Sequence, residues 1–345
     1  MDKAMPEKNA SGNILKNSGT VYFKTKPRIQ NTFTIVGPKE AESELGDLFD
    51  VKLESDLFEE KTFEKAECKM LSYAVKGLLK KSKLNEADIG ALVMGDLLNQ
   101  IVSSSFTARD YDVPFLGVYA ACSTITESLI LASTLIDAGH IDRAVCAVGS
   151  HFSTAERQYR YPLELGCIRP PQSQWTVTGS GAFLLGSGGD FPKITNATIG
   201  KVIDFGVTDA NNMGAAMAPA CAETLTTHFV NTKTRPEDYD LIVTGDLGAR
   251  GTRLLKHLMV EKNLPIDKNH VDCGELMYSI DEGDYQGGSG AGCSTVVVGS
   301  YIYKKLLKKQ INRVLFAATG ALLSTLTTQQ GESIPGVSHA ITLEI

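Results

Sequence analysis

The sequence predicts an α/β fold built from two homologous halves that pack together as a pseudo-dimer. From about residue 31, short aliphatic or β-branched runs alternate with segments of helical periodicity, as in folds whose buried strands are joined by helices. Short segments also recur in the same order along the chain, which indicates an internal repeat. The halves are placed at residues 31–190 and 195–345, after a polar lead-in at 1–30.

The individual elements follow from turn residues and periodicity. Strands are expected where apolar runs are bounded by turn residues, at 88–95, 113–120, 143–150, 181–187, 239–245, 313–319 and 338–345. Helices are expected where apolar residues recur at helical spacing, at 64–82, 123–139, 220–232, 252–263 and 294–310. The helix expected at 294–310 begins with β-branched residues, which favour strands. It is assigned as a helix because its counterpart in the first half of the repeat is one.

Two pairs of matched segments carry the repeat. ALVMGDL (91–97) has its counterpart in LIVTGDL (241–247), and ACST (121–124) in GCST (292–295). Each Cys-Ser-Thr segment opens a predicted helix, so two helices should begin side by side where the halves meet. Unpaired amides and the positive end of the dipole make a helix N-terminus an anion site. The pocket between the halves is therefore expected to suit a small acid.

Composition excludes several classes of protein. The net charge of −6 gives no basic field for nucleic acid, and the apolar runs fall short of the ~18 residues that span a bilayer. The first residues lack the apolar core of a secretion signal, so neither export nor a membrane anchor is expected. Seven scattered cysteines without a CxxC pair argue against a disulfide framework and a zinc site, and no DxDxDG run offers an EF-hand. No metal or cofactor is predicted.

Cys122 is the main candidate for chemistry. It follows the predicted strand at 113–120 through small residues and precedes Ser123 at the expected N-cap. This composition is typical of a strained strand-to-helix turn that presents a nucleophile to a pocket. The alternative is a buried structural cysteine, the commonest state of a free Cys. The repeat counterpart Cys293 lies in a Gly-rich segment and is interpreted as a packing residue.

Polar residues that follow the first-half strands are further candidates. His151 comes directly after a predicted strand, where α/β sheets place ligand groups, although a loop-packing histidine is the alternative. Arg157 suits planar recognition of a carboxylate, whereas an ion pair with Glu156 is the alternative for both residues.

Asp96 and Asn99 leave another strand on the face expected to carry Cys122. An aspartate beside an anionic ligand would need protonation or a shared Ca²⁺.

Several motifs together resemble known families. MGAAMAPA (213–220), DYDLIVTGDLGA (238–249) and GGSGAGCS (287–294) resemble the C-terminal half of thiolases and ketoacyl synthases, and VYAACST resembles their N-terminal nucleophile motif. Within that superfamily the chain resembles the stage V sporulation protein AD family of endospore-forming bacteria. The motifs that carry this second resemblance are GDLLNQ (95–100), ACST, SHFSTAERQYRYPLELG (150–166), TVTGSGA (176–182), MGAAMAPA and ATGALLS (318–324). The match covers the chain from about residue 31.

The resemblance implies both a fold and a function. The fold is thiolase-like, with five layers (αβαβα), and the function is non-catalytic binding of dipicolinic acid, alone or as its calcium complex, for uptake into the forespore and spore. Other proteins of the SpoVA apparatus, a location peripheral to the spore inner membrane, and a homodimer paired through the strand at 113–120 are implied as well. The residues expected to hold the ligand are Asp96, Asn99, Cys122, Ser123, His151, Glu156, Arg157, Gly288 and Ser289.

The catalytic families need two further side chains that this chain lacks. They place a basic or amide group after the strand written here as DLIVT and a His or Asn in the Gly-rich loop, to polarise a thioester and move protons. Gly245 and Gly288 take these positions, and Asp246 would oppose the developing negative charge. We therefore expect no catalytic residues. The alternatives are an acyl-transferring enzyme that uses Cys122 with His151, and a scaffold with a vestigial pocket.

Overall fold

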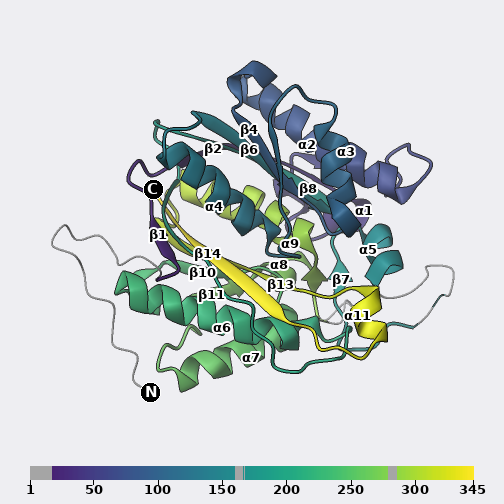
Figure 1. Cartoon of the computed structure of the whole chain (residues 1–345), viewed down its shortest axis with the longest axis vertical. Helices are drawn as coiled ribbons and strands as arrows, with labels where there is room; N and C mark the ends of the chain where they lie inside the picture. The colour runs from purple at the N-terminus through teal and green to yellow at the C-terminus, as the bar shows by residue number, and fades with distance from the viewer. Residues whose placement is uncertain (1–17, 160–165, 167, 279–285) are drawn as a thin grey trace.

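The computed structural model describes residues 18–159, 166, 168–278 and 286–345 (Figure 1). Most of its strands form one hydrogen-bonded sheet, whose main path runs in the order β11-β10-β13-β14-β9-β2-β8-β6-β4-β5, and β7 and β12 form a separate two-stranded sheet. The two halves of this path join only where Arg28 of β2 pairs with Lys193 of β9. The strand bounds are β2 Arg28–Val36, β4 Ala91–Gly95, β5 Phe115–Gly117, β6 Arg143–Ser150, β8 Gly179–Gly186, β9 Lys193–Thr198, β10 Leu241–Thr244, β11 His270–Asp272, β13 Arg313–Ala321 and β14 Gly336–Glu344.

The two halves of the sheet repeat one topology. In the first half β4 runs parallel to β5 and β6, while β8 is antiparallel to both β6 and β2. In the second half β10, β11, β13, β14 and β9 repeat these directions in the corresponding places. The internal repeat expected from the sequence is thus present as two α/β halves.

Helices divide the molecule into five layers (Figure 1). On the outer face of the first half-sheet lie α2 (Phe63–Ser82) and α3 (Val102–Ala108), and on that of the second lie α6 (Met213–Thr232) and α7 (Gly248–Glu261). Between the half-sheets lie α4 (Thr124–Asp137) and a long helix made of α9 (Ala291–Val297), the π-helical η7 (Val298–Ile302) and α10 (Tyr303–Leu307).

Inner strands such as β6 and β13 are buried on both faces, which explains their nearly continuous apolar runs. In β6, Cys146 and Val148 belong to the central core around α4 and α9. Val145 and Ala147 belong to the outer core beneath α2. Alternate residues of β13 divide in the same way between the central core and the core beneath α6.

The remaining elements are short. They are β1 Thr20–Tyr22, α1 Pro38–Ala41, η1 Gly46–Leu48, β3 Val51–Lys52, η2 Glu86–Asp88, η3 Asn99–Ile101, α5 Phe152–Tyr159, β7 Trp175–Thr176, η5 Pro236–Asp238, α8 Cys273–Met277, β12 Gly288–Ser289 and α11 Thr325–Gln329. β1 pairs with β9, so the described part of the lead-in forms an edge strand; residues 1–17 lie outside the described structure. No helix of the described chain is long and apolar enough to cross a membrane.

Some predicted elements differ from the structure. β2, β9 and β11 were not predicted, because β2 and β9 are rich in Thr and Asn and β11 has only three residues. The helix predicted at 220–232 begins seven residues earlier, at Met213, despite Pro219 inside it. Its first residues are small because α6 crosses α7 closely: a Cβ at Gly214 would lie 2.4 Å from a carbonyl oxygen at the start of α7.

Candidate functional site

Cys122 lies in the tight turn between β5 and α4, where the two halves meet. The preceding residue, Ala121, has φ +49°, in the left-handed region that favours glycine. The amide of Ser123 donates to the carbonyl of Ala120 at 2.9 Å and closes the turn. The end of β13 packs against it, since a Cβ at Gly320 would lie 2.3 Å from the carbonyl oxygen of Ala120. The strained strand-to-helix turn expected at Cys122 is therefore present, and the second half holds it in place.

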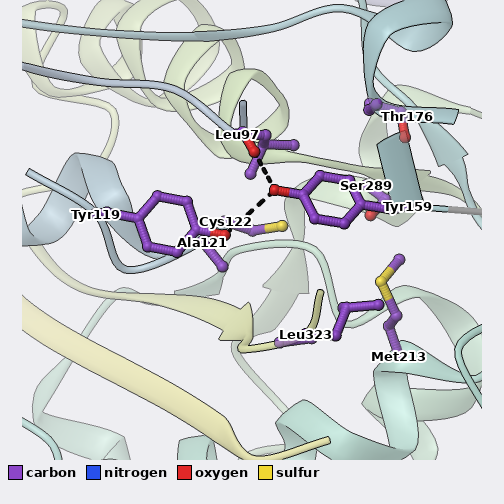
Figure 2. A pocket seen from close by; sticks show the side chains of 11 residues that line it. Leu97, Tyr119, Ala121, Cys122, Tyr159, Thr176, Met213, Ser289 and Leu323 are labelled. Atoms are coloured by element: carbon purple, nitrogen blue, oxygen red, sulfur yellow. Dashed lines mark hydrogen bonds between the residues drawn. The ribbon is translucent and has the colours of Figure 1, made fainter. Parts of the chain in front are cut away.

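A small pocket opens at this turn (Figure 2). Its cavity volume is about 30 Å³, and none of the described residues that line it carries a charge. The lining residues come from both halves and are Leu97, Tyr119, Ala121, Cys122, Ala155, Tyr159, Thr176, Met213, Ser289, Ala321 and Leu323. The volume is that of about one water molecule, so a larger ligand requires these side chains to move apart.

Two tyrosines close the pocket beside Cys122. Figure 2 shows the hydroxyls of Tyr119 and Tyr159 meeting there, and they lie 3.3 Å apart. Tyr159 also donates to the carbonyl of Leu97. Burial raises the pKa of both phenols. Both hydroxyls therefore stay protonated at neutral pH, and each can donate to a ligand once it leaves its present partner.

Asp246 is fully buried behind Cys122 and Ser289. Its Oδ2 accepts the amide of Gly290 at 2.8 Å and the hydroxyl of Ser289 at 3.3 Å, and its Oδ1 accepts the hydroxyl of Thr319 at 3.0 Å. The thiol of Cys122 donates to the same carboxylate. Burial outweighs these hydrogen bonds and raises the pKa of Asp246 to about 7.

The two central helices begin next to each other, but amides at their starts are already used. Besides the Gly290 amide, that of Gly292 donates to the hydroxyl of Ser150 at 2.9 Å. Ser123, at the N-cap of α4, donates its hydroxyl to the carbonyl of Ala318 at 3.0 Å. The amide of Gly292 and the hydroxyl of Ser123, at helix starts that were expected to face a ligand, join the two halves, and the amide of Gly290 bonds within the second half.

Asp96 and Asn99 shape the loop along one wall of the pocket. Asp96 is buried, and its carboxylate accepts the amides of Leu98 at 2.8 Å and Ser104 at 2.7 Å. Asn99 is exposed, and its backbone amide donates to Oε1 of Gln158 at 3.1 Å. Neither residue is among the described residues that line the pocket.

His151 is buried away from the pocket lining, and both of its ring nitrogens are engaged. Nδ1 accepts the amide of Ser153 at 3.1 Å, so Nε2 carries the proton and donates to the carbonyl of Asp56 at 2.9 Å. The ring also packs against Phe63, and burial lowers the pKa of the imidazole. This geometry gives no support to a catalytic pair with Cys122.

Glu156 and Arg157 are neighbours on α5 with different ion-pair partners. Glu156 is buried, with Oε2 2.7 Å from Nη1 of Arg169 and Oε1 3.4 Å from the hydroxyl of Thr176, which lines the pocket. Arg157 lies at the surface and pairs with Glu64 at 3.2 Å. Adjacent helical residues do not face each other, which explains why each has a partner other than its neighbour.

The two positions that lack a catalytic side chain are closely packed. A Cβ at Gly245 would lie 2.7 Å from the amide nitrogen of Thr319, which is closer than real Cβ atoms approach. At Gly288, on β12, a Cβ would meet Val177 at 3.1 Å and the sulfur of Cys293 at 3.3 Å. Neither position has space for a His or Asn side chain without movement of its neighbours.

Of the predicted residues, the pocket lining contains Cys122 and Ser289, with Gly288 and Ser123 next to them. Sequence reasoning missed Tyr119, Thr176 and the partly buried Arg169. It also left Asp246 out of the site, although the GDL repeat that selected Asp96 marks it equally. In the described chain, no three or more His, Cys, Asp or Glu side chains are arranged to hold a metal.

Two repeated α/β halves, five layers and a cysteine turn at their junction define a protein of the thiolase-like fold. Solved structures agree. The chain is similar to 3-oxoacyl-[acyl-carrier-protein] synthase III from Aquifex aeolicus, with a TM-score of 0.57 and 14% identity over 92% of this chain and 100% of that one. It is also similar to a variant of OleA from Xanthomonas campestris, with a TM-score of 0.63 and 12% identity over 94% and 99% of the chains.

Sequence comparisons define the family. The family description of stage V sporulation protein AD matches residues 17–344. Stage V sporulation protein AD of Bacillus subtilis (strain 168) is 44% identical over 330 residues, which cover 96% of this chain and 98% of the relative. The chain belongs to the stage V sporulation protein AD family.

Proposed function

We propose that this protein binds dipicolinic acid (pyridine-2,6-dicarboxylate) in the Cys122 pocket without catalysing a reaction. The observation that supports this proposal is the packing at Gly245 and Gly288. Thr319 at Gly245, and Val177 and Cys293 at Gly288, fill the space at both positions where a condensing enzyme carries its catalytic side chains, while a pocket persists at the cysteine turn. Without such groups, developing oxyanion charge lacks the side-chain donors that a condensing enzyme supplies, and losing even one donor costs on the order of 100-fold to 1000-fold in rate.

The pocket offers a planar aromatic acid both apolar walls and hydroxyl donors. Leu97, Met213 and Leu323 supply apolar surface, and Tyr119 and Tyr159 supply rings and hydroxyls. Entry of a pyridine ring requires the contact between the two tyrosines to open. Cys122 and Ser289 then contact the ligand, while Asp96, Asn99, Ser123, His151, Glu156, Arg157 and Gly288 hold the surrounding turns.

The proposal also covers the process, the partners and the oligomeric state in which the protein binds dipicolinate. The protein acts in dipicolinate uptake into the forespore and spore, with other SpoVA proteins, peripheral to the inner membrane. It forms a homodimer through β5, whose outer edge is unpaired among the described strands and carries the exposed Leu116. Tyr119, which follows β5 and is 42% exposed, places the dimer contact next to the pocket.

A thermal-shift panel with dipicolinate, its calcium complex and acetyl-CoA tests the function. A ligand at about 100 times its Kd adds about 2.7 kcal/mol of stability, so dipicolinate should raise the melting temperature and acetyl-CoA should not. If no diacid has an effect, the scaffold alternative with a vestigial pocket is favoured.

A second candidate function is acyl transfer, which the position of Cys122 at the pocket favours. Incubation with short acyl-CoA substrates, followed by mass spectrometry of the intact protein, tests it. We expect no acylation of Cys122, judged by comparison with Cys122→Ala, and no condensing turnover above background. Turnover that depends on Cys122 would support the enzyme and contradict the proposed function.

A further inference from the structure

Two of the polar groups that line the pocket bond to one buried carboxylate. Cys122 and Ser289 line the pocket, and both donate to Asp246. The amide of Gly290 and the hydroxyl of Thr319 complete the set of donors around it. A ligand carboxylate that reaches Cys122 and Ser289 therefore meets donors that already point at another anion.

No ion pair of the described residues includes Asp246, and the titratable groups that face it are acids and thiols. They are Cys122 from the turn before α4, Cys273 of α8, Cys293 of α9, and Asp272 at the end of β11. Asp272 accepts several backbone amides, and its charge adds to burial in raising the pKa of Asp246 to about 7. A second anion placed beside Asp246 raises that pKa further, because like charges disfavour ionisation.

We propose that binding of a diacid in this pocket is coupled to the uptake of one proton by Asp246. The inference rests on the proposed function and adds its regulation by pH. Above neutral pH the free protein holds Asp246 as a carboxylate. When the dianion binds, one solvent proton forms an O–H bond on Asp246, and the hydroxyl of Ser289 and the thiol of Cys122 turn to the ligand. One dianion and one proton enter, and the negative charge next to the ligand is removed.

Isothermal titration of dipicolinate into the full chain between about pH 6 and pH 9 tests the coupling. A dicarboxylic acid stays doubly ionised over this range, so changes in affinity report on the protein. For wild type we expect the Kd to rise by up to about tenfold per pH unit above pH 7, with uptake of up to one proton measured in buffers of different ionisation enthalpy.

Two variants complete the test. Asp246→Asn keeps the size of the side chain and removes its charge, so it should bind dipicolinate more tightly than wild type at about pH 8 and with little pH dependence. Glu40→Gln is the matched control. Glu40 is also buried with its pKa raised to about 7, but it lies outside the described pocket lining, so its replacement should keep the wild-type pH dependence.

The outcomes separate the inference from the proposed function. A pH-independent Kd and no proton uptake in wild type would overturn the inference while leaving dipicolinate binding intact. If Asp246→Asn does not fold, the proton uptake of the wild type decides the question. It is measured from the heat of dipicolinate binding in buffers of different ionisation enthalpy. Absence of binding at every pH would contradict the proposed function itself, and the inference with it.

Discussion

Glu156 Oε2 lies 2.7 Å from Nη1 of Arg169, and the two side chains are only 4% and 11% exposed. Arg169 also donates to the carbonyl of Gln174 and lies over the ring of Trp175. The pair thereby ties α5, which carries Tyr159, to β7, which carries Thr176. Through these two residues it supports two walls of the pocket.

Removal of one partner from this buried pair should be strongly destabilising. Glu156→Ala leaves the Arg169 guanidinium uncompensated, and we expect the free energy of unfolding to fall by about 3 to 5 kcal/mol. Arg157→Ala on the same helix removes a surface pair with Glu64 and a contact with the ring of Phe63, and should cost less than about 1 kcal/mol. Urea unfolding of both variants measures the difference, and equal losses would contradict the assignment of partners.

Gly320 should not tolerate a side chain. Its Cβ would lie 2.3 Å from the carbonyl oxygen of Ala120, a backbone atom that cannot rotate away. We expect Gly320→Ala to lower the free energy of unfolding by about 1 to 3 kcal/mol, as overpacking does, and to shift the Cys122 turn. Thermal unfolding together with dipicolinate titration checks both effects. Unchanged stability and binding would mean that β13 does not hold this turn.

Glu40 should make stability depend on pH. It is fully buried, and burial raises its pKa to about 7, although it accepts the amide of Thr178 and the hydroxyl of Tyr278. The folded state therefore retains a proton that the unfolded state releases between about pH 4.5 and pH 7. The stability contributed by protonated Glu40 is complete below about pH 4.5 and is lost as the pH rises to about 7.

The variant Glu40→Gln isolates this effect. Relative to wild type it should gain about 1.4 kcal/mol for each pH unit between those limits, measured by urea unfolding at several pH values. Burial lowers the pKa values of His228, His270 and His339 to about 3 to 4, so these residues make stability rise with pH. Their contribution is the same in the variant and in wild type and cancels in the comparison. Glu42→Gln, at an exposed position nearby, is the control for the substitution itself. A constant difference between Glu40→Gln and wild type would contradict the buried, protonated carboxyl.

The repeated fold was predictable because short segments of similar sequence occur in the same order in both halves. The GDL and Cys-Ser-Thr pairs each mark a strand end or a helix start, and these depend on neighbouring residues alone. The position of Cys122 followed from the same local signal. β11 escaped prediction because a strand of three residues has too little periodicity to detect.

The partners of the site residues depend on tertiary contacts and were not predictable. Nothing in the sequence around Glu156 indicates that Arg169 is its partner, because no periodicity connects the two positions. The approach of Asp246 to Cys122 requires the second half to fold against the first. The contact between Tyr119 and Tyr159 likewise joins the end of β5 to the end of α5.

Changes at Cys122 should affect binding and leave folding intact. Cys122→Ala removes one sulfur from the pocket wall, so we expect a folded protein with weakened dipicolinate binding. Cys122→Arg places a long cation in a cavity of about 30 Å³ and should abolish binding while the protein still folds. Circular dichroism establishes folding, and titration measures affinity. Unchanged binding by folded Cys122→Arg would place the ligand elsewhere.

The central claim, that this pocket recognises a dicarboxylate, is tested most directly by isothermal titration of dipicolinate and picolinate at the same pH and salt. Picolinate has the same ring and a single carboxylate. A charged hydrogen bond contributes about 1.5 to 3 kcal/mol, and 1.4 kcal/mol is a factor of ten in affinity. We predict that picolinate binds at least about tenfold more weakly than dipicolinate. Equal affinities, or no binding of dipicolinate, would contradict the claim.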